Sequence, residues 1–518
     1  MPKHEHHVAM LADIPDAGMR AVTVDGTDIL LLRHGDMIVA IGATCPHAGG
    51  PLAEGARHGD RIICPWHKAS FCIPTGALAD PPAVDPLPRY AVRVVGERVL
   101  LTLPSQPQRW PQMASDARCF VIVGAGAAGA LAAQTLRQEG FGGRIVMMDD
   151  KNKVPYDRTV LSKSFLSGSG GGEKSPLQSE SFYRQHQIER RAATVTELDA
   201  RDRRIACADG SSLRYDTALL ATGGVPRRPP LPGGDLGNVF ALRSRADADA
   251  LLAQAERSEH AAVLGAGFIG LEVAASLRER GLQVTVVGRE NGPLEKRLGA
   301  TVGNAFAALH RRQKVAFRLG CTVAALEGGP DVRGVRLGNG DFIAADLVVM
   351  GFGVTPATGF IRGVTLNDDG GVPVDAHLRA ADGLYAAGDI ASFPLRGDGA
   401  AIRVEHWRVA EQQGRIAAMN MLGRSVRYDA VPVFWTIQYM RTLDYIGHAT
   451  SWDEIVVHGD LEEGKFLAYY VKDGVVAAAA GMDRDKDTAA LIALMSLRPD
   501  WTATALGNDP VGVLAGVA

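Results

Sequence analysis

A glycine-rich pattern occurs twice in this chain, and each copy follows a short apolar segment. Both copies have the form Gly-x-Gly-x-x-Gly, at residues 124–129 and 265–270. Glycines at this spacing permit a tight turn from a strand into a helix, and they let a pyrophosphate approach the helix N-terminus closely. The pattern therefore predicts two dinucleotide-binding α/β units with parallel strands. The six glycines are Gly124, Gly126, Gly129, Gly265, Gly267 and Gly270.

The first copy has an acidic residue where a ribose would bind. The strand expected at residues 144–148 leads into Asp149 and Asp150, at a distance from the last glycine where a carboxylate can hold ribose hydroxyls. We assign this role to Asp150, and Asp149 is the alternative.

The second copy lacks that acid. Its strand, expected at residues 283–287, leads into Gly288 and Arg289. Loss of the carboxylate removes repulsion towards a 2′-phosphate, and an arginine can pair with one. The change favours NADPH, or use of both nicotinamide cofactors. The alternative is that Arg289 simply points to solvent.

The overall composition excludes several classes of protein. With 55 basic and 58 acidic residues the formal net charge is −3, so we expect no binding to nucleic acid or to acidic membranes. No stretch reaches ~18 uninterrupted apolar residues, which argues against a membrane span. Residues 1–10 are polar and His-rich, so we expect a flexible tail, no signal peptide and a cytoplasmic protein. The six cysteines contain no Cys-x-x-Cys pair, which argues against a disulfide reductase.

The residue pattern changes along the chain, which indicates several domains. Its 518 residues also exceed the number that one hydrophobic core usually holds. Residues 8–103 contain short apolar segments between Gly and Asp turns, typical of β-strands. Residues 104–117 are rich in Pro and Gln and are expected to form a connector, and a flexible loop is expected at 167–175. From about residue 428 the pattern favours an α+β unit. Strands are expected at 21–24, 29–33, 37–41, 92–95, 99–103, 466–471 and 475–480.

Two cysteines and two histidines form a spaced motif within the β-rich segment. Cys45 and His47 form a Cys-x-His pair, and Cys64 and His67 form a Cys-x-x-His pair after sixteen intervening residues. Two thiolates and two imidazoles could also suit zinc. The spacing and the β-rich surroundings resemble the Rieske family, in which two Cys hold one iron of a [2Fe–2S] cluster and two His hold the other. The resemblance implies that these four residues are the cluster ligands.

The Rieske resemblance also bears on the potential of the cluster. In Rieske proteins of high potential an extra disulfide joins the two loops, but the matching positions here are Gly50 and Trp66. Hydroxyls that bond to sulfur in those proteins are replaced by Ala69 and Phe71. With fewer hydrogen-bond donors to its sulfur atoms, the reduced cluster is stabilised less. This implies a low reduction potential, which suits a cluster that accepts electrons from a flavin. Lys68 stands where the family usually has Gly, and we expect this to affect loop geometry and docking but not ligation.

Further motifs extend a second resemblance over residues 118–518. They include VPYDR followed by LSK at 154–163, LLATG at 219–223, GFGVTP at 351–356 and LYAAGD at 384–389. Together they resemble the flavoproteins with two dinucleotide folds, the oxygenase-type ferredoxin reductases and the apoptosis-inducing-factor-like proteins. With the N-terminal motif, the whole chain is similar to the Rieske-containing group among the latter.

The resemblance implies a multidomain fold, with an all-β Rieske domain, two Rossmann-like α/β domains and an α+β C-terminal domain. The implied boundaries are 8–103 for the Rieske domain, 104–117 for a linker, 118–234 and 353–427 for a FAD-binding domain, 235–352 for an NAD(P)-binding domain and 428–518 for the C-terminal domain.

The resemblance also implies roles for single residues. FAD would bind at the first glycine motif, with Asp389 on its ribityl chain and Lys163 beside its ring. Lys163 would pair with Glu272 from the NAD(P) domain, and Phe268 would lie near the nicotinamide. Alternatively, Lys163 is a surface lysine, Phe268 and Trp435 are packing residues, and His406 is a structural histidine. The other implied FAD contacts are Arg158, Ala221, Thr222, Gly388, His406, Trp407 and Trp435.

The implied activity is electron transfer from NAD(P)H through FAD to the cluster, and then to an unknown one-electron protein acceptor. NAD(P)H gives a hydride and the cluster takes one electron, and flavin converts between the two. Lys163, Glu272 and Phe268 are the candidate catalytic residues. The acceptor could be an oxygenase, a cytochrome or a ferredoxin, and a monomer or homodimer is expected. The alternative function is a slow-turnover, NADH-binding redox sensor.

Overall fold

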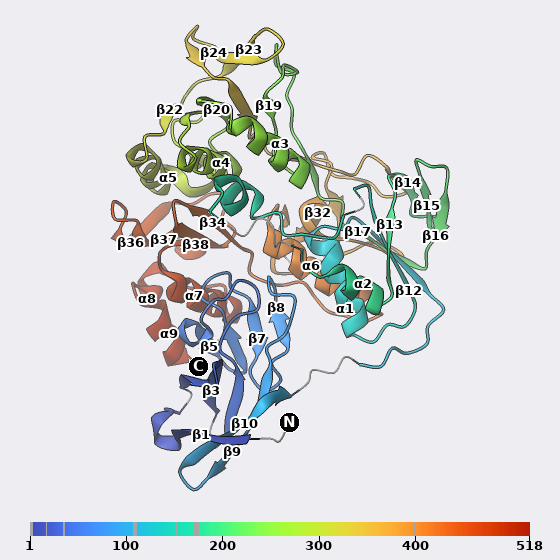
Figure 1. The fold of residues 1–518 in the computed structure, drawn as a ribbon, viewed down its shortest axis with the longest axis vertical. Helices are drawn as coiled ribbons and strands as arrows, with labels where there is room; N and C mark the ends of the chain where they lie inside the picture. Colours follow the sequence, from blue (N-terminus) through green and yellow to red (C-terminus); the bar gives the residue numbers. More distant parts are fainter. Residues whose placement is uncertain are drawn as a thin grey trace.

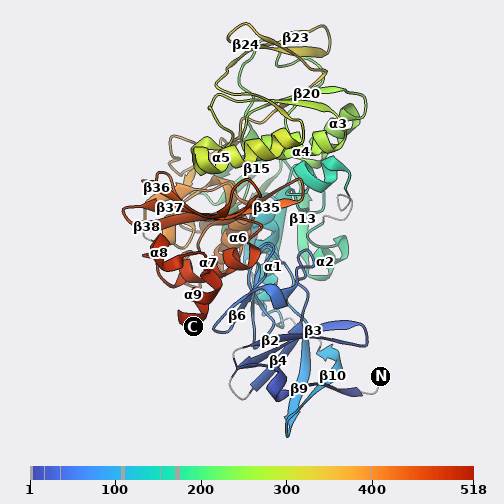
Figure 2. The same ribbon diagram turned by 90° about the vertical axis from the view of Figure 1, so that its left-hand side faces the viewer.

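The computed structural model describes residues 4–16, 18–34, 37–106, 111–151, 153–169, 176–397 and 399–517. A β-rich N-terminal domain lies at one end of the long axis and the second dinucleotide unit at the other (Figure 1). The first dinucleotide unit and the C-terminal domain lie between them, as the turned view in Figure 2 also shows. Parts of the expected connector and of the expected glycine-rich loop, residues 107–110 and 170–175, lie outside the described residues.

The N-terminal domain contains two antiparallel sheets. The larger has the strand order β1-β10-β9-β4-β3-β2, and the smaller, β5-β6-β7-β8, carries the cluster loops. The flexible tail predicted at residues 1–10 is wrong for its described part, because His4 pairs with Leu103 and the strand continues from there along β10. The strands are β1 (His4–Met10), β2 (Met19–Val24), β3 (Thr27–His34), β4 (Met37–Gly42), β5 (Ala56–His58), β6 (Arg61–Ile63), β7 (Ser70–Cys72), β8 (Leu78–Asp80), β9 (Arg89–Val95) and β10 (Arg98–Gln106).

The first dinucleotide unit is built on the sheet β13-β12-β11-β17-β31-β30. Its central strand β11 is parallel to both neighbours, as the glycine motif predicted. Helices α1 and α6 pack against each other so closely that a Cβ on Gly414 would lie 2.2 Å from the carbonyl oxygen of Ala128. The elements are β11 (Cys119–Val123), α1 (Ala127–Gln138), β12 (Arg144–Asp149), β13 (Ile188–Ala192), β17 (Thr217–Leu220), β30 (Arg379–Ala381), β31 (Leu384–Ala386) and α6 (Trp407–Met421).

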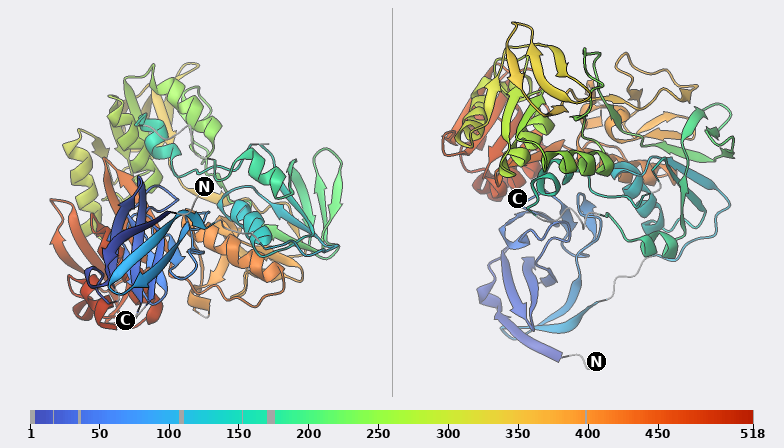
Figure 3. Two further views of the ribbon diagram at one scale, coloured as in Figure 1. Left: turned by 60° about the horizontal axis from the view of Figure 1, so that its bottom comes forward. Right: turned by 45° about the horizontal axis from the view of Figure 1, so that its top comes forward.

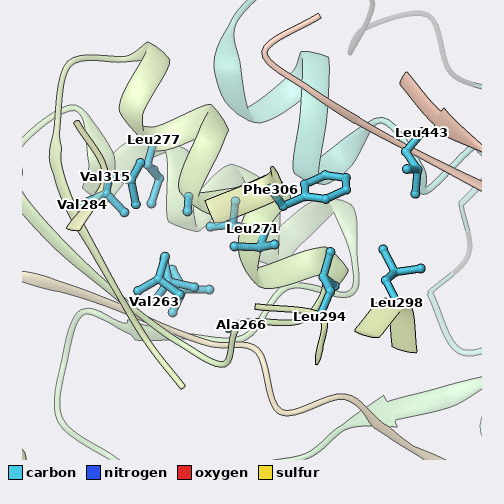
Figure 4. Close-up of a cluster of buried hydrophobic side chains, with 14 of the residues drawn as sticks. Val263, Ala266, Leu271, Leu277, Val284, Leu294, Leu298, Phe306, Val315 and Leu443 are labelled. Atoms are coloured by element: carbon cyan, nitrogen blue, oxygen red, sulfur yellow. The ribbon is translucent and has the colours of Figure 1, made fainter. Parts of the chain in front are cut away.

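The second dinucleotide unit repeats this plan with the sheet β19-β26-β20-β21-β22. Its core is continuous with the C-terminal domain, because Leu443 packs in the same cluster as Leu298 and Phe306 (Figure 4). The elements are β19 (Val239–Phe240), α3 (Arg245–Ala255), β20 (His260–Leu264), α4 (Phe268–Glu279), β21 (Gln283–Val287), α5 (Glu295–Arg312), β22 (Ala316–Arg318) and β26 (Leu347–Met350).

The C-terminal domain is the antiparallel sheet β34-β35-β38-β37-β36 with three helices on the side of the N-terminal domain. Ala56 and Ile63 of the N-terminal domain pack into the core formed by this sheet and its helices, and Figure 3 shows the two domains in contact. The elements are β34 (Val433–Gln438), β35 (Arg441–Gly447), β36 (Glu454–Asp460), β37 (Lys465–Lys472), β38 (Val475–Met482), α7 (Asp485–Leu497), α8 (Ala503–Leu506) and α9 (Pro510–Val517).

The glycines of both motifs are required by close backbone approach. Gly124 and Gly265 have φ values of +111° and +116°, which residues with a side chain rarely adopt. A Cβ on Gly129 would lie 1.9 Å from the carbonyl oxygen of Gly124, and a Cβ on Gly270 would lie 2.1 Å from that of Gly265. Each of the nine expected strands lies within an observed one, and the predicted multidomain fold class is confirmed. No helix in the described ranges is long and apolar enough to cross a membrane.

Candidate redox site

The two loops with the expected cluster ligands lie side by side at one end of the smaller N-terminal sheet. Cys45 and Cys64 are 2% and 1% exposed. The Nδ1 atoms of His47 and His67 lie 3.1 Å apart. The backbone N–H of each cysteine donates to a carbonyl five residues further along its own loop, at 2.8 Å in both cases. The turns therefore hold the two thiols as one pair and the two imidazoles as another.

These four side chains fit a cluster with two metal centres. The hydrogen bond shared by the two thiols lowers the pKa of Cys64 and raises the pKa of Cys45, so it favours the thiolate form of Cys64 alone. Burial lowers the pKa of both His47 and His67, which keeps the imidazoles in the neutral form that binds metal. The two thiols share a hydrogen bond, and the two imidazoles lie with their Nδ1 atoms 3.1 Å apart. Two pairs fit a [2Fe–2S] cluster better than a single tetrahedral zinc ion.

The surroundings of the sulfur atoms contain few hydrogen-bond donors from side chains. All six cysteines are free, so no disulfide joins the two loops. A Cβ on Gly50 would lie 2.7 Å from the Cys64 sulfur, so a larger side chain would crowd the ligand. Ala69 and Phe71 are completely buried and carry no hydroxyl. The low potential inferred from these residues stays a prediction.

The histidine pair faces Trp435 of the C-terminal domain. We call the side of the cluster loops formed by His47 and His67 the histidine edge. The ring centroids of His67 and Trp435 lie 4.7 Å apart, and those of His47 and Trp435 lie 6.2 Å apart. Burial most strongly, and then the charges of His47, Lys68 and Lys163, lower the pKa of His67. Lys163, expected at the flavin, is therefore within electrostatic range of this edge of the cluster loops.

One face of α6 holds the N-terminal domain in place. Arg408 Nε donates to the carbonyl of Pro81 at 2.9 Å, Gln412 Nε2 to Asp80 Oδ1 at 3.2 Å, and Arg415 Nη1 to the carbonyl of Leu78 at 2.7 Å. These three residues follow the helical spacing i, i+4, i+7, so they project from the same side of the helix. Residues 78–81, which include β8, are therefore held along the helix that begins at the expected flavin site.

Lys163 and Glu272 meet between the two dinucleotide units. Lys163 Nζ lies 2.9 Å from Glu272 Oε2 and also donates to the carbonyl of Thr159 at 2.9 Å. Glu272 is 3% exposed, and it also accepts hydrogen bonds from Ser162 Oγ at 2.5 Å and Thr436 Oγ1 at 2.7 Å. Three elements thus fix the lysine: the segment 161–165, helix α4 and strand β34. Sequence reasoning found the ion pair but missed Ser162 and Thr436.

Two arginines flank the first glycine turn. A Cβ on Gly126 would have Arg158 Nη2 as its nearest neighbour, at 3.8 Å. Arg243 Nη2 lies 2.7 Å from Asp389 Oδ2. Burial first, and then the nearby charge of Arg243, lowers the pKa of Arg158. Arg243 is paired with Asp389, so Arg158 is the cation of the two that best suits the pyrophosphate expected at this turn. Arg243 lies outside every motif, so the sequence carried no signal for it.

Three other residues implied as FAD contacts lie just after strands β17 and β31, beside this turn. Ala221 is buried, and its N–H donates to the carbonyl of Val123 at 2.8 Å. Thr222 Oγ1 donates to the carbonyl of Ala357 at 2.8 Å. Gly388 has a φ of +79° and begins the short helix that carries Asp389.

Aromatic rings meet around Phe434, the residue before Trp435 on β34. Phe434 contacts both Phe268 and His406, with ring centroids 4.7 and 4.3 Å away. Burial, more than any nearby charge, lowers the pKa of His406 to about 3, and its Nδ1 is buried without a partner. Trp407 is the first residue of α6. An orphaned polar nitrogen at the start of a helix fits a polar group of the flavin, which leaves the predicted role of His406 intact.

Two expected residues are not brought into contact with the others. Asp150 is exposed in the turn after β12, whereas Asp149, at the strand end, lies near enough to Arg158 to raise its pKa slightly against the effect of burial. Arg289 is exposed after β21. The neighbouring Glu290 pairs with Lys296 at 2.9 Å and is an acid that sequence reasoning did not consider. The roles of Asp150 and Arg289 stay predictions.

Comparison with family models identifies three regions of the chain. Residues 119–414 match the pyridine nucleotide-disulphide oxidoreductase model, which is more than half of the 518 residues. The chain belongs to this family. Residues 4–91 match the Rieske [2Fe-2S] domain and residues 433–514 match the reductase C-terminal domain. The chain is therefore an oxidoreductase of the ferredoxin reductase type, with an FAD/NAD(P)-binding region and a Rieske [2Fe–2S] domain. The four predicted metal ligands lie within the Rieske match.

Individual relatives match this chain over different lengths. Apoptosis-inducing factor 3 of Mus musculus is 37% identical over 500 residues, covering 93% of this chain and 82% of the relative. Rhodocoxin reductase of Rhodococcus erythropolis is 34% identical over 391 residues, covering 74% of this chain and 92% of the relative. The crystal structure of the covalent putidaredoxin reductase–putidaredoxin complex matches with a TM-score of 0.73 and 29% identity, over 78% of this chain and 99% of that one.

The cluster site generates a prediction about composition. Anaerobically purified protein should contain two irons and one FAD per chain, because the donor set provides two pairs of ligands rather than four convergent ones. On reduction it should give a Rieske-type EPR signal. Metal analysis and EPR on the same sample check this, and stoichiometric zinc in a fully loaded preparation would contradict it.

Proposed function

We propose that this chain is an NAD(P)H-dependent reductase that passes electrons through FAD to its own Rieske cluster and on to a protein acceptor. The observation that carries the proposal is the 4.7 Å separation between the ring centroids of the cluster ligand His67 and Trp435. Trp435 precedes Thr436, which bonds to Glu272 at the site of Lys163. One strand thus reaches both the cluster loops and the expected flavin site.

The chain's own residues position and polarise the reacting groups. FAD, when bound, accepts a hydride and releases electrons singly, which is the conversion that a one-electron cluster needs. Glu272 and the carbonyl of Thr159 hold the Lys163 ammonium in one place, so a fixed positive charge faces the negative charge that develops during hydride transfer. Phe268 lies beside Phe434 at the N-terminus of α4 and closes the nicotinamide side. No side chain is required as a general acid or base.

The built-in Rieske domain takes the part of a separate ferredoxin in this proposal. Several relatives are named as ferredoxin reductases, and one solved relative is a complex with the separate protein putidaredoxin. Here the histidine edge of the cluster loops already faces Trp435 within the chain. The cluster would then deliver single electrons to an oxygenase, a cytochrome or another ferredoxin.

The order of the carriers can be tested by removing the cluster. Cys64→Ser should abolish the cluster but leave reduction of FAD by NAD(P)H unchanged, because its ligand loop is separate from the Lys163 site. Reduction of a one-electron protein acceptor such as cytochrome c should fall at least about tenfold. Stopped-flow absorbance measures the first step and steady-state turnover the second. Cys72→Ser, a half-buried cysteine on β7 that ligates nothing, is the matched control.

A substitution at the expected flavin site should give the opposite defect to Cys64→Ser, slow reduction of FAD with normal transfer to the cluster. Lys163→Ala should slow FAD reduction by about tenfold or more, because it removes the fixed positive charge. Once the flavin is reduced chemically, transfer to the cluster should proceed as in the wild type.

If Cys64→Ser reduces every acceptor at the wild-type rate, the Rieske domain is outside the main electron path and a sensor role replaces the proposal.

The choice of nicotinamide cofactor depends on Arg289 in this proposal. Arg289→Ala should weaken NADPH binding by about 1.5–3 kcal/mol, the worth of a charge-assisted contact to phosphate, and should barely affect NADH. The ratio of kcat/KM for the two cofactors measures the effect. Arg333→Ala, another exposed arginine of the same domain, is the control. If the ratio of kcat/KM values is unchanged, Arg289 does not contact the cofactor and simply faces solvent.

A further inference from the structure

Lys68 follows the cluster ligand His67 directly and has an unusual environment. Its φ is +64°, a left-handed conformation that glycine adopts easily and lysine does not. The residue is also completely buried, although lysine is almost never buried without a partner. A side chain kept at this position despite both costs must make a specific contact.

That contact is with the C-terminal domain. Lys68 Nζ lies 2.7 Å from Asp444 Oδ2, and both side chains are at most 1% exposed. The ammonium also donates to the carbonyl of Pro65 in its own loop and to the carbonyl of Asp485 at 3.2 Å. Thr488 Oγ1 donates to Asp444 Oδ2 at 2.7 Å. A cluster loop and the C-terminal domain are therefore joined by a desolvated, hydrogen-bonded ion pair.

The position of this pair is linked to that of Trp435. Trp435 on β34 and Asp444 on β35 are directly opposite each other in the antiparallel register. Side chains at opposite positions lie on the same face of a sheet, about 4.5–5.5 Å apart at Cβ. Two consecutive loop residues, His67 and Lys68, thus contact two residues that face each other across the hairpin. Placing Lys68 on Asp444 also places His67 on Trp435.

The other side of Lys68 is held by the first dinucleotide domain. Arg408 Nη2 donates to the Lys68 carbonyl at 3.1 Å, while its Nε donates to the carbonyl of Pro81. The backbone and the side chain of one residue are thus fixed from two different domains. A surface ion pair would leave many relative orientations open, but a buried pair is strongly penalised in any orientation that separates its charges.

We propose that the Lys68–Asp444 pair is a docking lock that keeps the histidine edge of the cluster on Trp435, so that electron transfer needs no movement of the Rieske domain. Lys68 and Asp444 are positioning residues in this role and touch no reacting atom. The inference rests on the proposed electron path from FAD to the cluster, and it adds that this path operates from one fixed arrangement.

The test compares this pair with an exposed pair of the same type. Lys472 and Asp453 also lie 2.7 Å apart but are 42% and 51% exposed, so Lys472→Met and Asp453→Asn are matched controls for Lys68→Met and Asp444→Asn. The double variant Lys68→Gly/Asp444→Asn leaves no stranded charge, and its glycine suits the φ of +64°. This variant keeps the test valid if single charge removal impairs folding.

The readout is the transfer step itself in the full-length holoenzyme. After mixing with NADH or NADPH, flavin bleaching is followed by absorbance and cluster reduction by freeze-quench EPR, with and without sucrose as viscogen. In the wild type and both controls, cluster reduction should be independent of viscosity. In the lock variants it should slow by at least about tenfold and fall as viscosity rises, because re-docking then limits the rate. Flavin bleaching should stay unchanged.

Viscosity dependence confined to the second step separates a docking role from a general loss of stability. If the lock variants reduce their cluster as fast as the wild type and without viscosity dependence, the lock is wrong but the electron path stands. If the wild-type cluster stays oxidised while the flavin is reduced, the electron path fails and the lock fails with it.

Discussion

The arrangement of this protein depends on one short stretch of contact, in which His67 and Lys68 meet Trp435 and Asp444. The first pair of side chains is aromatic and the second is ionic, and the two members on the sheet are direct cross-strand partners. Aromatic packing alone tolerates sliding, whereas a buried ion pair has one favourable geometry. The two together fix both the distance and the register between the cluster loops and the reductase.

Several charged groups at the expected flavin site are paired or neutral. Two partly buried cations lie at the expected FAD site, Lys163 held by Glu272 at 2.9 Å and Arg243 held by Asp389 at 2.7 Å. Each is neutralised by one carboxylate in the resting protein, which limits the cost of its burial. Glu411 on α6 is 1% exposed, and burial first and then Asp157 raises its pKa well above the usual range. Its neutral form avoids an uncompensated negative charge within α6, the helix that contacts the Rieske domain.

Sequence reasoning succeeded where function imposes a local pattern. The glycine turns at Gly124 and Gly265 and the Cys–His spacing at Cys45 and Cys64 each sit within a few consecutive residues, and the structure has the expected local geometry. The strand at His4–Met10 was missed because its sequence is polar, and it is held by backbone pairing to an edge that lies about a hundred residues away. Local hydrophobic patterning carries no information about such a partner.

The contacts between domains were beyond sequence reasoning for the same reason. Lys68 could be recognised as a departure from the family, and an effect on docking was expected, but nothing in the chain indicated Asp444 as its partner. Arg408 and Arg415 have the spacing of an ordinary helix surface, yet each donates to the Rieske domain. Arg243 likewise lies outside any motif. A single sequence shows which residues are unusual, whereas the fold shows what they contact.

The most direct test of the central claim is the concentration dependence of cluster reduction. After anaerobic mixing with NADH or NADPH at one fixed, saturating concentration, freeze-quench EPR would follow the Rieske signal in the wild-type protein over a tenfold range of protein concentration. Transfer within one chain predicts a first-order rate constant that does not change on dilution. A rate that falls in proportion to dilution, or a cluster that stays oxidised while the flavin is reduced, would contradict the account.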